Sequence, residues 1–243
     1  MLTSKDIAQM IDHALLKPDM GEEAVRAGCE TARKYGTATV CVRPCDLPLA
    51  AEALKGSCVK LCTVIGFPHG ANSTAVKVFE ANRAMDDGAV ELDMVLNIGR
   101  LVSGRFDDVE SDIRAVVAAA HSRGAIIKVI LENAYLTDAQ KAKACRLSER
   151  AGADFVKTST GFAPAGAALD DLKLMRAACS GRVRLKAAGG VRTLDNVLSC
   201  RAVGCARCGS SSTAAIMEEA LRREAAGTLQ EIDPAEARLG QGY

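Results

Sequence analysis

The stretch "ADFVKTST", residues 153–160, is a short apolar run interrupted by one lysine, Lys157. Runs of roughly four to eight residues that are apolar on both faces are typical of strands inside a parallel sheet. A segment of helical composition, "TDAQKAKACRLSERAG" at residues 137–152, precedes this run and ends in glycine, the residue that most often terminates a helix. The pattern therefore predicts a helix followed by a buried strand that carries an ammonium group.

The same unit recurs along the whole chain. Helical segments such as "GEEAVRAGCETARKYG" (21–36) and "ANSTAVKVFEANRAMDDG" (71–88) separate the apolar runs. The seven further runs are "IAQMIDHALL" (7–16), "TATVCV" (37–42), "VKLCTVIGF" (59–67), "AVELDMVLNIG" (89–99), "AIIKVILE" (125–132), "VRLKAAGG" (183–190) and "CARCGSS" (205–211).

Eight such units in 243 residues predict an α/β fold, a single-domain (β/α)8 TIM barrel over residues 1–243. A short C-terminal tail, "EARLGQGY" (236–243), follows and is expected to be mobile. A doubly wound open sheet is the alternative, because periodicity cannot count strands around a barrel. The "GxGxxG" motif of dinucleotide-binding sheets does not follow any of the predicted strands, which disfavours that alternative.

Charge and composition indicate a small-molecule partner. The chain has 31 basic and 30 acidic residues, a net charge of +1, and no long block of like charge. We therefore expect no binding to nucleic acid and none to a membrane surface. The first residues lack the pattern of a secretion signal, and no run of about 18 apolar residues occurs, so a cytoplasmic location is expected.

The ten cysteines are scattered among aliphatic residues and are interpreted as reduced, small hydrophobic side chains. The only CxxC is "CARC" (205–208). It has no second pair at zinc-site spacing, and in a strand an offset of three places two thiols on opposite faces. The three histidines are too dispersed for a local metal motif. We expect no metal and no cofactor.

Charged residues interrupt five of the predicted strands, and active groups of barrels lie at the C-terminal ends of strands. Each one alone has a structural explanation, an ion pair across the barrel. Two lysines that converge with an aspartate, however, form a coupled site in which one ammonium favours the neutral amine of the other. A neutral amine attacks carbonyls, and the resulting iminium accepts electrons from a breaking C–C bond. The five residues are Asp12, Asp93, Lys128, Lys157 and Lys186.

Two glycine- and serine-rich loops follow the seventh and eighth predicted strands, where barrels often bind phosphate. Backbone N–H groups at a helix N-terminus together with hydroxyl groups suit a dianion. The alternative for either loop alone is a simple turn or a helix cap. The candidate phosphate-binding residues are Gly189, Gly190, Gly209, Ser211 and Ser212, with Gly161 from the loop after Lys157.

Taken together, "MIDHALLKP", "VCVRP", "LCTVIGFPHG", "ELDMVLNIG", "KVILENAYLTD", "DFVKTSTGF", "LKAAGGVRT" and "RCGSSS" resemble the deoxyribose-phosphate aldolase family over nearly the whole chain. The resemblance implies a (β/α)8 class I aldolase that reversibly cleaves 2-deoxy-D-ribose 5-phosphate into D-glyceraldehyde 3-phosphate and acetaldehyde. It implies that Lys157 forms the Schiff base and that Lys186 and Asp93 move protons. The phosphate loops match the six residues named above, and Asp12 and Lys128 match polar residues of the catalytic pocket.

The chain departs from the family pattern at a few positions near these motifs. Ala14 and Ala188 replace hydroxyl residues, and Arg43 and His69 replace an asparagine and a leucine; Cys208 and Ser210 also differ. Tyr243, the last residue, resembles a terminal tyrosine that some members fold over the site.

Several functional alternatives stay open from sequence. They are another Schiff-base aldolase of phosphorylated sugars, a non-catalytic phosphosugar-binding barrel, and a phosphosugar isomerase with a Glu or Cys/Asp base. A homo-oligomer, dimer or tetramer, is likewise left open.

Overall fold

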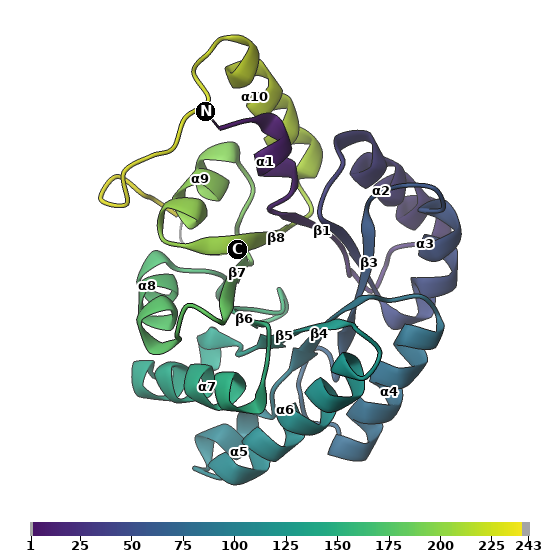
Figure 1. The fold of residues 1–243 in the computed structure, drawn as a ribbon, viewed down its shortest axis with the longest axis vertical. Helices are drawn as coiled ribbons and strands as arrows, with labels where there is room; N and C mark the ends of the chain where they lie inside the picture. The colour runs from purple at the N-terminus through teal and green to yellow at the C-terminus, as the bar shows by residue number, and fades with distance from the viewer. Residues whose placement is uncertain (1, 240–243) are drawn as a thin grey trace.

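Eight parallel strands close into a barrel in the computed structural model, which describes residues 2–239. Each strand pairs with its sequence neighbour, and β1 also pairs with β8, which closes the ring (Figure 1). The closed ring confirms the predicted TIM barrel and excludes the open sheet. The strands are β1 (Ile11–Leu15), β2 (Thr39–Val42), β3 (Lys60–Ile65), β4 (Glu91–Val95), β5 (Ile126–Ile130), β6 (Phe155–Lys157), β7 (Arg184–Ala188) and β8 (Cys205–Ser210).

Helices surround the ring of strands on its outer side (Figure 1). Left-handed glycines end α2 and α7 as expected, at Gly36 and Gly152. The helices are α1 (Ser4–Ala8), α2 (Glu22–Tyr35), α3 (Leu47–Ala53), α4 (Thr74–Asp86), α5 (Ile98–Val102), α6 (Phe106–His121), α7 (Asp138–Ala151), α8 (Leu169–Ala178), α9 (Leu194–Ala202) and α10 (Thr213–Ala225), with single 3-10 turns η1 (Pro44–Asp46) and η2 (Asn133–Tyr135).

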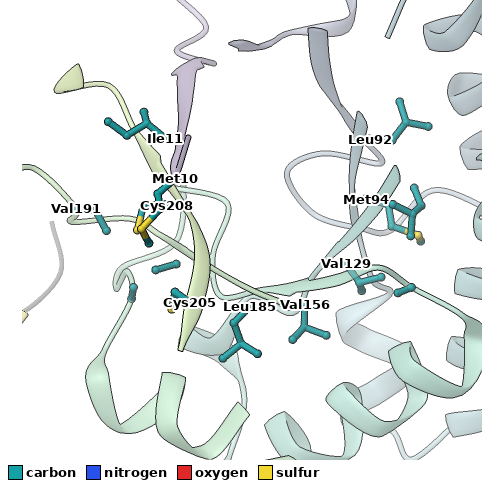
Figure 2. Close-up of a cluster of buried hydrophobic side chains, with 14 of the residues drawn as sticks. Met10, Ile11, Leu92, Met94, Val129, Val156, Leu185, Val191, Cys205 and Cys208 are labelled. Atoms are coloured by element: carbon teal, nitrogen blue, oxygen red, sulfur yellow. The ribbon is translucent and has the colours of Figure 1, made fainter. Parts of the chain in front are cut away.

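The two faces of the strands carry different chemistry. Apolar side chains such as Leu92, Val129 and Val156 point outward and form the main core against the helices (Figure 2). Inside the barrel a much smaller apolar cluster holds Cys41, Cys62 and Val64. The remaining inward positions include buried charges, which the alternation of side chains along each strand places on the barrel axis.

The N-terminal prediction was wrong in its boundaries. The run 7–16 was read as one strand, but its first residues belong to α1 and only Ile11–Leu15 forms β1. A capping box explains the helix: the Thr3 hydroxyl accepts from the Asp6 N–H, and the Asp6 carboxylate accepts from the Thr3 N–H. The signal was present in the sequence as "TSKD". In the structure, α1 packs against α10.

The expectation that the "CARC" thiols face opposite ways was also wrong. The pairing of β7 with β8 jumps from Cys205 to Arg207, so Ala206 is an extra residue in a β-bulge. A bulge resets the alternation of side chains, so Cys205 and Cys208 both point outward. Both side chains belong to the main core, together with that of Cys200 in α9.

The described part of the tail packs against the barrel helices instead of lying free. Ala237 is buried, and the Arg238 N–H donates to the Ser199 hydroxyl at 2.9 Å. Tyr243 lies outside the described residues. Within 2–239, no helix has both the length and the apolar composition needed to cross a bilayer.

His13 connects β1 to the first turn of α10. Its side chain is buried, and Nδ1 lies 2.8 Å from the hydroxyl of Thr213. Burial lowers the pKa of His13 to about 4. Because an exposed imidazole has an ordinary pKa of about 6.5, the unfolded chain binds a proton here at a higher pH than the folded chain.

We therefore predict that the protein loses stability as the pH falls from about 6.5 to 4, and that His13→Asn removes part of that loss. Between a pH well above 6.5 and a pH well below 4, protonation of His13 lowers the free energy of unfolding by about 3 kcal/mol. Urea unfolding of both proteins at several pH values measures it. An unchanged pH dependence in the variant would show that His13 titrates alike in both states.

Candidate active site

Lys157 and Lys186 are direct neighbours in the register between β6 and β7. Their ammonium groups converge on one oxygen, Oδ2 of Asp93 in β4, at 2.8 Å each. All three side chains are almost completely buried. The three residues that the sequence singled out as a catalytic set therefore meet at one point, although 93 positions separate Asp93 from Lys186.

Lys128 and Asp12 extend this cluster. The Lys128 ammonium lies 2.8 Å from the second oxygen of Asp93, and it contacts Glu91 at 2.7 Å and Asp12 at 3.6 Å. Asp12 also pairs with Lys186 at 2.5 Å. The structure thus joins all five strand charges that the sequence pattern identified.

Glu91 and Arg207 complete the network and were missed from the sequence. The Arg207 guanidinium donates to Asp12 at 2.6 Å and to Glu91 at 3.3 Å. Glu91 precedes Asp93 by two positions in β4, so strand alternation could have placed it on the same face. Arg207 lies between the two cysteines of "CARC". That segment was interpreted only for its thiols, so no role was predicted for the arginine.

Four cations face three carboxylates in this network. Burial alone would raise the pKa of Asp93, but the ammonium groups of Lys128, Lys157 and Lys186 hold it well below its usual range. Burial likewise opposes charge on Lys186, yet Asp12 and Asp93 raise its pKa above the ordinary value. Asp93 is therefore ionised and Lys186 protonated at neutral pH. The network carries one positive charge in excess when all seven side chains are charged.

A cavity of about 470 Å³ opens above the network at the C-terminal ends of the strands. Asp12, Lys157 and Lys186 line it, whereas Asp93 and Lys128 are not among its lining residues and lie beneath its floor. Of the predicted phosphate-binding residues, the ones on its wall are Gly161, Gly189, Gly190, Gly209 and Ser211. Ser212 lines a neighbouring cavity of about 720 Å³ instead.

The loops after β7 and β8 are held together by a short set of contacts. Gly189 and Gly190 both have φ of +83°, a left-handed conformation that glycine adopts without strain. The Ser210 hydroxyl at the end of β8 donates to the carbonyl of Val191 at 2.6 Å and accepts from the Ser212 N–H at 3.0 Å. The two glycine- and serine-rich segments thus form one continuous wall.

Comparison with known proteins assigns this arrangement to a family. A model described as DeoC/LacD family aldolase matches residues 7–214. The chain belongs to this aldolase family. It is 51% identical over 215 residues to a deoxyribose-phosphate aldolase of Caldanaerobacter subterraneus, covering 88% of this chain and 93% of that one. A deoxyribose-phosphate aldolase of Thermococcus gammatolerans is 49% identical over 225 residues, covering 92% of this chain and all of the other.

A solved structure agrees with these sequence relatives. The deoxyribose-phosphate aldolase of Aeropyrum pernix, described as a tetramer, superposes with a TM-score of 0.83 at 32% identity, covering 89% of this chain and 92% of that one. The fold and the family are therefore consistent with one another.

Three of the departures from the family pattern have a defined place in the structure. Ala14 and Ala188 both line the cavity, so the hydroxyl groups they replace would have faced it. Arg43 has a clear structural role: its guanidinium pairs with Asp46 at 2.6 Å and donates to the backbone carbonyls of Lys17, Pro18 and Met20. It fixes the loop after β1, which carries Lys17 into the cavity wall.

The cavity of this aldolase has further lining residues that were not predicted from the sequence. Lys17 and Arg192 place cationic side chains on the wall near the phosphate loops, and Thr160 and Phe162 flank Gly161. Arg192 follows the Gly-Gly turn by two positions, a signal that the sequence did contain. Lys17 and Thr160 stand in segments that were quoted for the resemblance without being assigned a role.

One group of described residues has metal-ligand geometry. The ligand atoms of Cys41, Cys62 and Asp93 lie within 4.8 Å of one another inside the barrel. Three ammonium groups already occupy the Asp93 oxygens, so a cation there would have to displace at least one of them. Zinc accepts thiolate and carboxylate ligands, but the ammonium groups around Asp93 repel a divalent cation at this position.

We predict that Asp93→Asn destabilises the fold by about 3–5 kcal/mol, because it leaves four buried cations facing two carboxylates. Adding Lys128→Met to Asp93→Asn restores the original excess of one positive charge and should recover part of the loss. The midpoints of urea unfolding at pH 7 compare the three proteins. A double variant as unstable as the single one would contradict this account of the charge balance.

Proposed function

We propose that the protein is a class I aldolase that reversibly cleaves 2-deoxy-D-ribose 5-phosphate into D-glyceraldehyde 3-phosphate and acetaldehyde through a Schiff base on Lys157. The observation that carries the proposal is the pair of lysines sharing Asp93 at the floor of a cavity. The curated relatives, which bear the name of this reaction, support the choice of substrate.

Lys157 is the cation best suited to give up its proton. It contacts a single carboxylate of the network, whereas Lys128 contacts three, and Lys186 and Arg207 contact two each. Loss of the Lys157 proton leaves three cations facing three carboxylates. The neutral amine at the cavity floor then attacks C1 of the open-chain sugar.

Lys186 and Asp93 are proposed to move the protons of the subsequent steps. Lys186 starts protonated and donates its proton to the hydroxyl of the carbinolamine. The hydroxyl then leaves as water and the iminium forms. Asp93 touches both ammonium groups through one oxygen, so a proton can pass between them without a large movement. Lys186, neutral after protonating the carbinolamine, takes the proton of the C3 hydroxyl as the C2–C3 bond breaks, which releases the phosphorylated aldehyde and passes the bonding electrons into the iminium to give an enamine. Lys186 then returns the proton to C2, and water hydrolyses the new iminium to acetaldehyde and the free Lys157 amine. This chemistry calls for no cofactor.

The glycine and serine wall is proposed to bind the phosphate. The Gly189–Gly190 turn, Ser211 just before α10 and the cations Lys17 and Arg192 all border the same cavity. Backbone N–H groups, hydroxyl groups and cations together suit a dianion. Asp12 lies in the floor, and Lys128 supports Asp93 from below. Ser212 lines the neighbouring cavity and its backbone N–H donates to the Ser210 hydroxyl, so it would shape the loop rather than contact the phosphate.

The wider assignment follows the family. We propose that residues 1–243 form one aldolase domain that acts in the cytoplasm as a homo-oligomer, as the tetrameric relative suggests. The substrates are a small phosphosugar and aldehydes, with neither nucleic acid nor membrane as a partner. Another Schiff-base aldolase of phosphorylated sugars shares the amine chemistry, and product analysis distinguishes it.

Borohydride reduction in the presence of acetaldehyde should attach a two-carbon unit to Lys157, because borohydride reduces the iminium to a stable secondary amine. Peptide mass spectrometry identifies the residue and the fragment together. Lys157→Leu should abolish both the adduct and turnover while the fold persists, since the apolar side chain buries no charge. A label found on Lys186 instead would overturn the assignment.

Ser211→Asp should lower kcat/KM for 2-deoxyribose 5-phosphate by roughly 100-fold, about 3 kcal/mol, because a carboxylate would then face the dianion. The unphosphorylated sugar serves as the internal control and should react nearly as before, as should acetaldehyde trapping at Lys157. Steady-state kinetics with both sugars measure the effect. Equal losses for both sugars would mean that Ser211 supports the barrel rather than the phosphate.

A further inference from the structure

Glu132, just after β5, occupies an unusual position. It is the one described non-glycine residue with a positive φ, at +57°, a left-handed conformation that is unfavourable for a glutamate. Its side chain is only 2% exposed. Burial raises the pKa of its carboxyl, although hydrogen bonds from Thr160 oppose the shift. A strained backbone and a buried carboxyl at one position indicate that the group it holds has to be placed accurately.

That group is Thr160, in the loop that follows Lys157. The Glu132 carboxylate accepts from the Thr160 backbone N–H, at 3.3 and 3.2 Å from its two oxygens, and also from the Thr160 hydroxyl. Thr160 lines the cavity, as do Lys157 and Gly161, the residue that follows Thr160 in sequence. Glu132 itself is not a lining residue, so it can act on a ligand only through Thr160.

The hydrogen bonds fix the polarity of the Thr160 hydroxyl. A hydroxyl has one proton to donate and two lone pairs that accept. Its proton goes to Glu132, and one lone pair accepts from the Phe162 N–H at 3.1 Å. One lone pair of the hydroxyl oxygen remains available to a ligand in the cavity. Thr160 can therefore accept a hydrogen bond from a ligand but cannot donate one.

We infer that Glu132 is a positioning residue that holds Thr160 as a hydrogen-bond acceptor and thereby selects aldehydes with a hydroxyl next to the carbonyl. The inference rests on the proposed function. In 2-deoxyribose 5-phosphate, the C3 hydroxyl loses its proton during cleavage, but the C4 hydroxyl keeps its proton throughout. The C4 hydroxyl lies between the reacting carbons and the phosphate, and Thr160 lies in sequence between Lys157 and Gly161, which both line the cavity.

The test compares two acceptor aldehydes in the synthetic direction, with acetaldehyde as donor. D-glyceraldehyde 3-phosphate carries the hydroxyl, and 3-oxopropyl phosphate is the same molecule without it. The wild-type protein should favour the first by about 10-fold in kcat/KM, the value of one hydrogen bond. Glu132→Gln and Thr160→Val should each bring the ratio close to 1, mainly because kcat/KM for the hydroxylated acceptor falls. Acetaldehyde trapping at Lys157 should continue in both variants.

A matched control exists in Glu149, which accepts from the backbone N–H and the hydroxyl of Ser180 in the same manner away from the cavity. Glu149→Gln should keep the wild-type ratio. Glu132→Gly, which suits the left-handed backbone, is a second variant in case the amide disturbs the loop.

Several results would overturn the inference: a wild-type ratio near 1, a wild-type ratio retained in Thr160→Val, or equal losses for both acceptors in both Glu132 variants. A wild-type protein that traps no acetaldehyde would overturn the proposed function and this inference with it. Trapping at Lys157 with an unchanged ratio in the variants would overturn this inference alone.

Discussion

Three ammonium groups converge on the carboxylate of Asp93 inside the barrel, and the surrounding charged side chains are arranged around this contact. Buried charges are tolerated only when they are paired at close range. The register of β4, β5, β6 and β7 brings the partners together, because each of these strands contributes one of them. Asp12 and Glu91 then pair with the ammonium groups that Asp93 alone cannot neutralise, and Arg207 bridges these two carboxylates.

The placement of apolar and charged residues explains how the barrel can hold such a network. The main hydrophobic core lies between strands and helices, so the fold does not depend on an apolar barrel interior. The interior is left for ionic contacts, capped by a cavity at the C-terminal ends of the strands. One cation in excess of the carboxylates, located at the cavity floor, is what the proposed amine chemistry requires. Stability and reactivity thus come from different faces of the same strands.

The glycine and serine wall and the lysine cluster occupy two regions of one cavity. Hydrogen bonds within the wall, such as that from Ser210 to Val191, join loops from two strands. Arg43 does the same for the loop after β1, where it fixes the segment that carries Lys17. A substrate with a carbonyl at one end and a phosphate at the other would span these regions. The Glu132–Thr160 contact joins the loops that follow β5 and β6.

The sequence by itself determined the barrel and the lysine–aspartate set, because a charge that interrupts a run that is apolar on both faces is easily recognised. The same rule would have found Glu91, two positions before Asp93. Only the tertiary structure decided the face of Cys208, since a bulge arises from pairing with β7. It also decided the partnership of Glu132 with Thr160, 28 positions apart. Local patterns record which face a residue prefers, whereas its partner depends on the register between strands that the whole closed barrel sets.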